Sequence, residues 1–180
     1  MSAPALASTL PHRPLRPDDA HRWAALLAAV EAADRRGEHY DAADCAEELA
    51  EPDVDFARDS VLVFDGDDPV AYQVLRRTGP AGARVLHTDT AVHPDHRGRG
   101  IGTALLDLAR RRAAELGADL HVRVPESVPA AVALVEDAGL VPVRWWSELS
   151  RELAEPVVPV ALPSGSALHR LGPDYDAARW

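Results

Sequence analysis

The sequence predicts an α/β domain of the α+β type, in which a mixed central sheet of about six to seven strands is flanked by about four helices. Two observations support this fold class. Stretches with strand-like alternation are interleaved with stretches of helical periodicity along most of the chain. The length of 180 residues suits one ordinary domain with a full core and little else.

The N-terminal part predicts a short strand and two helices. Residues 17–19, Pro-Asp-Asp, begin the first helix, and Asp41 is placed to cap the second, which runs to about Leu49. The first helix carries a single apolar face, made of Trp23, Leu26, Leu27 and Val30.

Three strands follow these helices. Residues 59–65 and 70–77 alternate in polarity and flank the turn cluster Gly66-Asp67-Asp68-Pro69, which is typical of a hairpin. The strand at 84–92 is expected to pair next. It leads directly into a glycine-rich loop at 93–102.

The second half predicts a helix from Gly100 to Gly117, a strand at 120–124, a helix at 127–138 and a last strand at 140–149. In the first of these helices, Arg110 to Arg112 are expected to be solvated. They lie opposite an apolar stripe made of Ile101, Leu105, Leu108 and Ala109.

The loop at 93–102 predicts a phosphate site. Its glycines alternate at positions 98, 100 and 102, so the backbone turns tightly and leaves its N–H groups open. The helix that follows aims its positive end at the same place. Each contact of this kind contributes about 0.3 to 1 kcal/mol, so several donors on a pyrophosphate are expected.

Two other phosphate motifs do not fit. A Walker loop needs Gly-Lys-Ser/Thr, whereas Gly102 precedes Thr103, and the third glycine of a dinucleotide fingerprint would also fall on Thr103. What fits is Arg-x-x-Gly-x-Gly, formed by Arg97, Gly100 and Gly102 between a strand and a helix. This pattern resembles motif A of the GNAT superfamily of acyl-CoA-dependent N-acyltransferases. The order of predicted elements is similar as well, over about residues 8–153.

The resemblance implies transfer of an acetyl group from acetyl-CoA to an amine, by direct attack of the amine on the thioester. No metal is implied. The strand end would hydrogen-bond the pantetheine arm and the loop amides would hold the pyrophosphate. The implied cofactor-binding residues are Ala91, Val92, Arg97, Gly98, Arg99, Gly100, Ile101, Gly102 and Thr103.

The positions for proton transfer depart from the family pattern. Family members often carry Glu or His four or six residues before the position of Val92, where this chain has Thr88 and Leu86. On the later helix, Val128 and Val135 replace the usual Asn and Tyr. His87 and Asp89 lie on the other strand face unless a bulge re-aims one of them.

These departures bear on the acceptor. An amine with a pKa of about 10.4 is neutral in about one molecule in 2,500 at pH 7, so a missing base favours an amine of low pKa. Candidate catalytic groups are Asp89 and Tyr40, with Glu38 and His121 as further candidate bases.

Two functions therefore stay open, an active acyltransferase for a small-molecule amine or amino terminus, and a non-catalytic CoA-binding module that supports a catalytic second domain. A third alternative is an acyl carrier or nucleotide-binding protein of another fold. The acceptor region implied by the resemblance spans 31–51 and 144–148, where Tyr40, Trp145 and Trp146 could line the site.

Composition narrows the partners. The net charge of −10 argues against nucleic acid, while Arg97, Arg99 and residues 110–112 predict a local basic island suited to an anionic cofactor. His93 and His96 lack further ligands nearby in sequence, so no zinc site is expected. The single Cys45 and the lack of a signal pattern or membrane-length apolar run predict a cytoplasmic protein.

The C-terminal part predicts the start of another domain. Residues 1–153 are expected to form the GNAT-like domain, 154–166 a Pro-rich linker, and 167–180 a truncated second GNAT domain. The last of these repeats the chain's beginning, since 15–23 aligns with 171–180 around one skipped residue. The arrangement is similar to the N-terminal half of tandem GNAT proteins such as mycothiol synthase. A docked tail and a homodimer are the alternatives.

Overall fold

The computed structural model describes residues 10–78, 84–147, 149, 154 and 160–167. It divides into two units, Met1–Val141 and Pro142–Trp180. The first contains every helix and strand of the described residues. In the second, the described residues form coil with one turn, in which the Ser166 amide donates to the Pro163 carbonyl.

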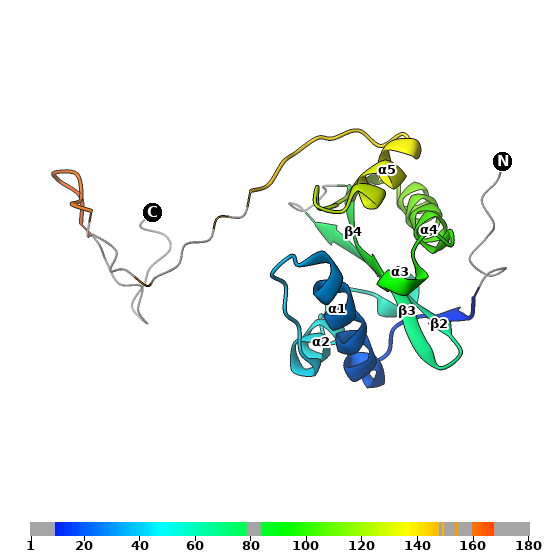
Figure 1. The fold of residues 1–180 in the computed structure, drawn as a ribbon. Helices are drawn as coiled ribbons and strands as arrows, with labels where there is room; N and C mark the ends of the chain where they lie inside the picture. The colour runs from blue at the N-terminus through cyan, green and yellow to red at the C-terminus, as the bar shows by residue number, and fades with distance from the viewer. Residues whose placement is uncertain (1–9, 79–83, 148, 150–153, 155–159, 168–180) are drawn as a thin grey trace. The chain divides into compact units, whose positions relative to one another are not determined.

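The first unit is built on a mixed sheet in the order β1-β2-β3-β4-β5 (Figure 1). The first three pairings are antiparallel, and β4 pairs with β5 in parallel. The strands are β1 (His12–Arg13), β2 (Ser60–Asp65), β3 (Asp68–Thr78), β4 (Val85–Val92) and β5 (Asp119–Val122).

Helices cover both faces of this sheet (Figure 1). A 3-10 turn at Pro17–Asp19 leads into α1 (Ala20–Asp34), which packs with α2 (Ala42–Leu49) on one face. A short turn, α3 (Phe56–Asp59), precedes β2. On the other face lie α4 (Ile101–Leu116) and α5 (Pro129–Asp137).

Local sequence signals explain where these elements begin and end. The Asp41 side chain accepts hydrogen bonds from the amides of Ala43 and Asp44, which confirms the predicted cap of α2. Gly117 ends α4 in the left-handed conformation with φ of 59°, as predicted. Gly66, with φ of 63°, turns the chain between β2 and β3.

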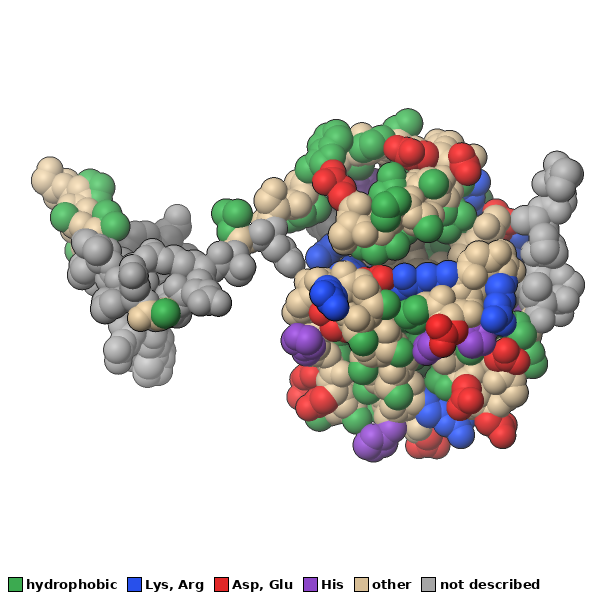
Figure 2. Space-filling view, viewed as in Figure 1, with side chains coloured by type: hydrophobic (Ala, Val, Ile, Leu, Met, Phe, Trp, Pro, Cys, Tyr) green, Lys and Arg blue, Asp and Glu red, His purple; other side chains and the backbone are tan. Residues whose placement is uncertain are grey.

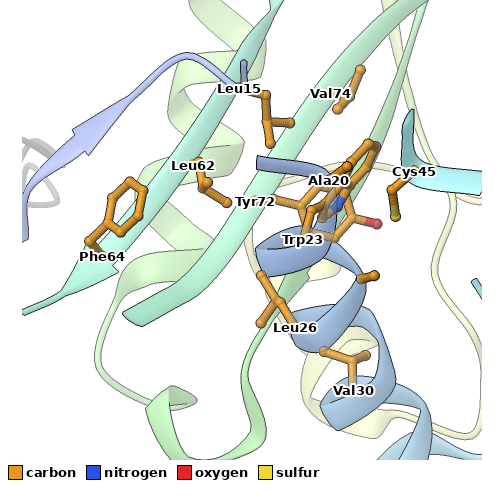
Figure 3. Close-up of a cluster of buried hydrophobic side chains, with 11 residues drawn as sticks. Leu15, Ala20, Trp23, Leu26, Val30, Cys45, Leu62, Phe64, Tyr72 and Val74 are labelled. Atoms are coloured by element: carbon orange, nitrogen blue, oxygen red, sulfur yellow. The ribbon is translucent and has the colours of Figure 1, made fainter. Parts of the chain in front are cut away.

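The core occupies both faces of the sheet. On the α1 face, the fully buried Trp23 meets Tyr72 edge to face at 5.2 Å between ring centroids. Figure 3 shows both residues with the surrounding aliphatic side chains. On the α4 face, Leu105 and Val63 are both buried. Because β2 and β3 are covered on both faces, they read as nearly continuous apolar runs.

Two predictions about elements are wrong. The described residues contain five strands rather than six to seven, since 140–147 and 149 form no strand. Val141, Val143, Trp145 and Trp146 alternate or cluster as a strand would, yet all four side chains are mostly exposed. Apolar alternation favours a strand only when a sheet edge is available to pair with it. The helices number five among the described residues because α3 was missed.

Arg112 was expected to be solvated, and this is also wrong. Its side chain is only 15% exposed and donates to the buried Asp59 carboxylate, which ties α4 to α3. A second, looser contact reaches Glu115 at 3.1 Å. Arg112 therefore stabilises the packing of α4 against α3.

No helix of the described residues is long and apolar enough to cross a membrane.

Candidate cofactor and acceptor site

The site begins where two parallel strands separate. β4 and β5 pair from Val85 opposite Asp119 to Thr88 opposite Val122. Beyond this point β4 continues to Val92, whereas the chain after β5 leaves the sheet toward α5. The end of β4 therefore has no strand beside it on the β5 side. Apart from the Val92 carbonyl, which accepts a hydrogen bond from Arg97, the backbone polar groups that β4 turns to this side are open to a ligand.

A cavity of about 490 Å³ lies in this fork. Its walls come from β4, the loop after it, the first turn of α4, α5 and the end of α1. Figure 2 shows the surface recessed below α5, with arginine side chains along the recess. The volume falls in the range usual for small-molecule sites. Eight of the residues predicted to bind the cofactor line it: Ala91, Val92, Arg97, Gly98, Gly100, Ile101, Gly102 and Thr103.

The loop presents a row of free donors to this cavity. Within the described residues, the amides from Gly98 to Thr103 donate no hydrogen bond to the chain, and the first amide of the following helix to do so is that of Ala104. Helix α4 adds the positive end of its dipole at the same point. Several N–H groups on one anion are the arrangement expected for a pyrophosphate.

Glycine is required here for two different reasons. Gly98 and Gly100 have φ of 72° and 83°, and a Cβ at either position would meet nothing within 4 Å. These two glycines therefore serve the backbone conformation and keep the cavity open. Gly102 instead has ordinary φ, and a Cβ there would lie 3.1 Å from Cδ2 of Leu134. It allows α4 and α5 to approach each other.

The Arg97 side chain is already engaged within the protein. Its Nη1 and Nη2 donate to the two carboxylate oxygens of Asp34 at 2.7 and 2.8 Å. Its Nε donates to the Val92 carbonyl at 3.1 Å. Arg97 therefore ties the loop and the end of β4 to the last residue of α1. It contributes to the cradle, the row of open amides from Gly98 to Thr103, by holding the loop in place.

Most of the arginines of the predicted basic island are engaged within the protein, and two of them, Arg97 and Arg112, are neutralised by carboxylates. Arg99 does not line the cavity, and its side chain donates to the Asp95 carbonyl at 2.9 Å. Arg110 donates to the Ala138 carbonyl, and Arg112 is paired with Asp59. Arginine side chains hold the loop and helices in place.

The two faces of β4 carry different chemistry. Its pairing with β3 runs without a shift in register, so the bulge that could re-aim a side chain does not occur. Thr88 and Thr90 lie on the α4 face and line the cavity. Asp89 lies on the α1 face, where it accepts a hydrogen bond from the Tyr72 hydroxyl at 2.9 Å.

Carboxylates gather around Asp89. Arg76 binds Glu48 at 2.7 Å and Glu51 at 3.1 Å, and its guanidinium lies 3.8 Å from the carboxylate of Asp89. Burial raises the pKa of Glu48, an effect that Arg76 opposes and Asp89 reinforces. One arginine therefore faces three carboxylates. The surface here favours a cation.

Tyr40 belongs to the same acidic surface. Burial raises the pKa of its hydroxyl, and Glu38, Glu48 and Asp89 raise it further. The phenol therefore keeps its proton at neutral pH, which suits a hydrogen-bond donor or general acid and disfavours a base. Glu38 is itself paired with Arg36 at 3.2 Å and lies 3.8 Å from Arg123.

Four of the eight histidines form two edge-to-face pairs. His87 and His121 lie opposite each other on β4 and β5, with centroids 5.2 Å apart. His93 and His96 are 5.5 Å apart beside the loop, and His96 Nε2 lies 3.2 Å from Asp65. Among the described residues, no cluster of three or more His, Cys, Asp or Glu side chains is arranged to hold a metal.

Of the other predicted site residues, Val128 and Val135 line the cavity, at the positions where the family often carries Asn and Tyr. Residues 144–147 belong to the second unit, and Glu148 lies outside the described residues. Sequence reasoning missed Gln73, whose buried amide lines the cavity. A glutamine within the apolar run from Val70 to Leu75 was the available signal.

Comparisons with known proteins agree with this geometry. Residues 23–140 match the profile of the acetyltransferase (GNAT) family. A mycothiol acetyltransferase from Streptomyces scabiei is 34% identical over 122 residues, which cover 67% of this chain and 38% of that protein. One from Frankia casuarinae is 35% identical over 94 residues, which cover 51% of this chain and 27% of that protein. The chain thus spans less than half the length of these relatives.

Solved structures share the fold. A GCN5-related N-acetyltransferase from Sphaerobacter thermophilus superposes with a TM-score of 0.66 at 27% identity, over 76% of this chain and 46% of that one. A diaminobutyrate acetyltransferase from Paenibacillus lautus, solved with L-2,4-diaminobutyric acid and coenzyme A, gives 0.57 at 19% identity. That likeness covers 72% of this chain and 74% of the other, and it concerns the fold alone.

Proposed function

The chain belongs to the acetyltransferase (GNAT) family, and on that premise we propose that it transfers an acetyl group from acetyl-CoA to an amine of a small molecule or an amino terminus. The observation that carries the proposal is the row of unbonded amides from Gly98 to Thr103, which opens on the cavity at the β4–β5 fork. It provides donors for a pyrophosphate and a strand end for the arm attached to it.

The residues present fit acetyl-CoA. The amides of Gly98 to Thr103 would hold the diphosphate, and the Val92 amide, which β4 turns toward its open side, would bind the pantetheine arm beside Ala91. The Arg97–Asp34 pair keeps the loop against the end of α1. Acetyl-CoA supplies the acyl group already activated as a thioester. The protein's task is then to orient it and bring up the amine.

The acidic surface on the α1 face is the proposed acceptor side. A protonated amine would be attracted by Asp89 and Glu48, which share Arg76 as their cationic partner. For attack, the amine nitrogen must lose a proton, and Asp89 is the proposed acceptor of it. A C–N bond forms, the C–S bond breaks with its electrons on sulfur, and Tyr40 is the proposed donor of a proton.

A specific observation favours a second function, that of a non-catalytic CoA-binding module. Val128 and Val135 line the cavity, and Leu86 is fully buried, so none of these positions offers a proton-transfer group. In this reading residues 1–153 form the module, 154–166 the linker and 167–180 the start of a second GNAT domain that carries out the chemistry. Residues 168–180 lie outside those described.

One experiment distinguishes the two functions. Acetyl-CoA and CoA are titrated into the 180-residue chain by calorimetry, and thiol release is then followed with a panel of amines that includes diaminobutyrate and peptides with free amino termini. Micromolar binding with turnover supports the enzyme, and an Asp89→Asn variant should then lose rate with little change in the Kd for acetyl-CoA. Binding without turnover on any amine supports the module. Absence of binding rejects both.

A comparison of amines with different pKa values adds a check on the acceptor. Without a strong general base, turnover should depend on the fraction of neutral amine, so amines with pKa near 8 should react faster at pH 7 than those near 10.4. If both classes react equally well, the proton is removed by a stronger base than Asp89.

The location in the cytoplasm stays a prediction from sequence.

A further inference from the structure

A buried polar cluster lies on the cavity side of the sheet and has no part in the pyrophosphate loop. Gln73 on β3 is 3% exposed and Thr88 on β4 is 7% exposed, while Thr90 is half-buried. All three line the cavity. They lie beneath α4 among apolar residues, where polar groups cost free energy unless they are hydrogen-bonded. Three such residues together therefore require an explanation.

The hydrogen bonds of this cluster leave one donor over. Gln73 Nε2 donates to the Leu105 carbonyl at 3.1 Å, and its other hydrogen faces the hydroxyls of Thr90 at 3.2 Å and Thr88 at 3.4 Å. The two hydroxyl oxygens are also hydrogen-bonded to each other. Because both oxygens face the amide donor, neither O–H points at Gln73.

Counting protons then gives a direction. One hydroxyl donates to the other, and the second O–H has no acceptor among the described residues. Thr88 is enclosed, whereas Thr90 is half-buried and borders the cavity. The arrangement in which Thr88 donates to Thr90 is favoured, because it leaves the Thr90 proton facing open space. The cluster thus holds one O–H donor ready for a ligand.

The position of Thr90 indicates which part of a ligand it meets. It lies on the end of β4 that has no β5 partner, about 7 Å along the strand from Val92. A ligand whose diphosphate occupies the loop must run back along β4 toward this point. Its far end carries the acyl group. The neighbouring cavity walls there, Val122 and Val124, include no second hydroxyl.

We propose that the Thr90 hydroxyl, held in place by Gln73 and Thr88, donates a hydrogen bond to the acyl carbonyl oxygen and makes the site select acylated over free CoA. This inference rests on the proposed function. As the amine adds to the carbonyl carbon and the C–S bond breaks, the carbonyl oxygen gains negative charge, and a pre-oriented donor stabilises it. Thr90 keeps its proton throughout. Gln73 and Thr88 are positioning residues.

The test compares Thr90→Val, which removes the hydroxyl at nearly constant shape, with Thr90→Ser, which retains it. Calorimetry measures the Kd of each variant for acetyl-CoA and for CoA. We expect Thr90→Val to weaken acetyl-CoA binding about 3- to 10-fold, the usual worth of one hydrogen bond, with the Kd for CoA unchanged. Thr90→Ser should retain the preference of the natural chain.

A spectroscopic readout separates a hydrogen bond from a change in shape. The infrared carbonyl stretch of bound acetyl-CoA, labelled with carbon-13 at the carbonyl, should shift to lower frequency on the natural chain and on Thr90→Ser, and not on Thr90→Val. Gln73→Met, which keeps the hydroxyl and removes its orientation, should give a broader band at intermediate frequency. Thermal melting followed by circular dichroism reports whether each variant folds.

The outcomes are distinguishable. If the natural chain binds neither acetyl-CoA nor CoA, the proposed function fails. If both ligands bind, and Thr90→Val leaves both the ratio of the two Kd values and the carbonyl frequency unchanged, the role of Thr90 is overturned while the proposed function stands.

Discussion

At the scale of single residues, Arg97 shows how a motif position acts through its neighbours. The motif suggests a phosphate ligand, yet all three of its donor groups are bonded to Asp34 and Val92. What remains free is the backbone from Gly98 onward. The proposed anion site is therefore made of amides, and Arg97 holds the loop that carries them against Asp34 and Val92.

The first prediction concerns Gly100. A Gly100→Glu variant places a carboxylate and a Cβ in the open space of the cradle, so binding of acetyl-CoA should be abolished in calorimetry. The φ of 83° adds strain of about 1 to 3 kcal/mol. Gly66→Glu is the matched control, because Gly66 has a similar φ of 63° and open surroundings in the β2–β3 turn. Equal affinity in the two variants would show that the loop does not hold the ligand.

A second prediction concerns Cys45, the single cysteine of the chain. Burial raises the pKa of its thiol from 9.0 to about 11, with smaller contributions from Glu48 and nearby aspartates. At pH 8 the thiolate fraction should fall about 100-fold relative to an unshifted thiol, so labelling by a disulfide reagent should be slowed at least as much. Rapid labelling of the native protein, at the rate seen in urea, would contradict this.

The same shift predicts a direction for stability. Since the pKa of the Cys45 thiol is higher in the folded than in the unfolded state, its contribution to the free energy of unfolding is complete below pH 9. This contribution is lost as the pH rises toward 11.

At the scale of elements, an ion pair joins the end of α1 to the loop before α4. Asp34 is the last residue of α1, its side chain is only 10% exposed, and it binds Arg97 through both oxygens. The neighbouring Arg35 has φ of 52°, which turns the chain away after the helix. The position of the loop before α4 therefore depends on the end of α1, through the Asp34–Arg97 pair.

The third prediction tests that connection. Asp34→Asn removes the charge that pairs with Arg97 and should cost about 1 to 3 kcal/mol of stability in urea unfolding. It should also weaken acetyl-CoA binding, because the loop loses its anchor. Asp67→Asn, an exposed carboxylate in the β2–β3 turn, is the control and should change neither quantity. A loss of stability without any change in the Kd for acetyl-CoA would show that the Asp34–Arg97 pair does not position the loop amides for binding.

Elements with strong local signals could be predicted from sequence. The cap at Asp41, the stop at Gly117 and the hairpin around Gly66 all depend on nearby residues, and the structure has each of them. The region 140–149 could not be predicted in this way, since pairing of its apolar residues depends on a distant edge. Arg112 was misjudged for the same reason, because its partner Asp59 lies far away in sequence.

The candidate site was predictable to a similar extent. Glycine spacing indicated the loop, since local backbone freedom suffices for that inference. The acidic surface around Arg76 and the cluster around Gln73 required the pairing of β3 with β4, which no local pattern specifies.

At the scale of the whole molecule, the first unit holds all the described secondary structure and the entire cavity. The fourth prediction follows from this. Truncation after Leu153 should leave the melting temperature nearly unchanged and the affinity for acetyl-CoA intact. A large drop in melting temperature would instead indicate a tail that docks on its own domain.

The alternation along β4 has a consequence for how such a protein can diversify. Thr88 and Thr90 border the cavity, whereas Asp89, which lies between them in sequence, borders the acidic surface. A single nucleotide change in a codon therefore alters one wall and leaves the other in place. On the proposed function, preference for the acyl donor and preference for the amine can then change separately, and a laboratory library could vary one while holding the other constant.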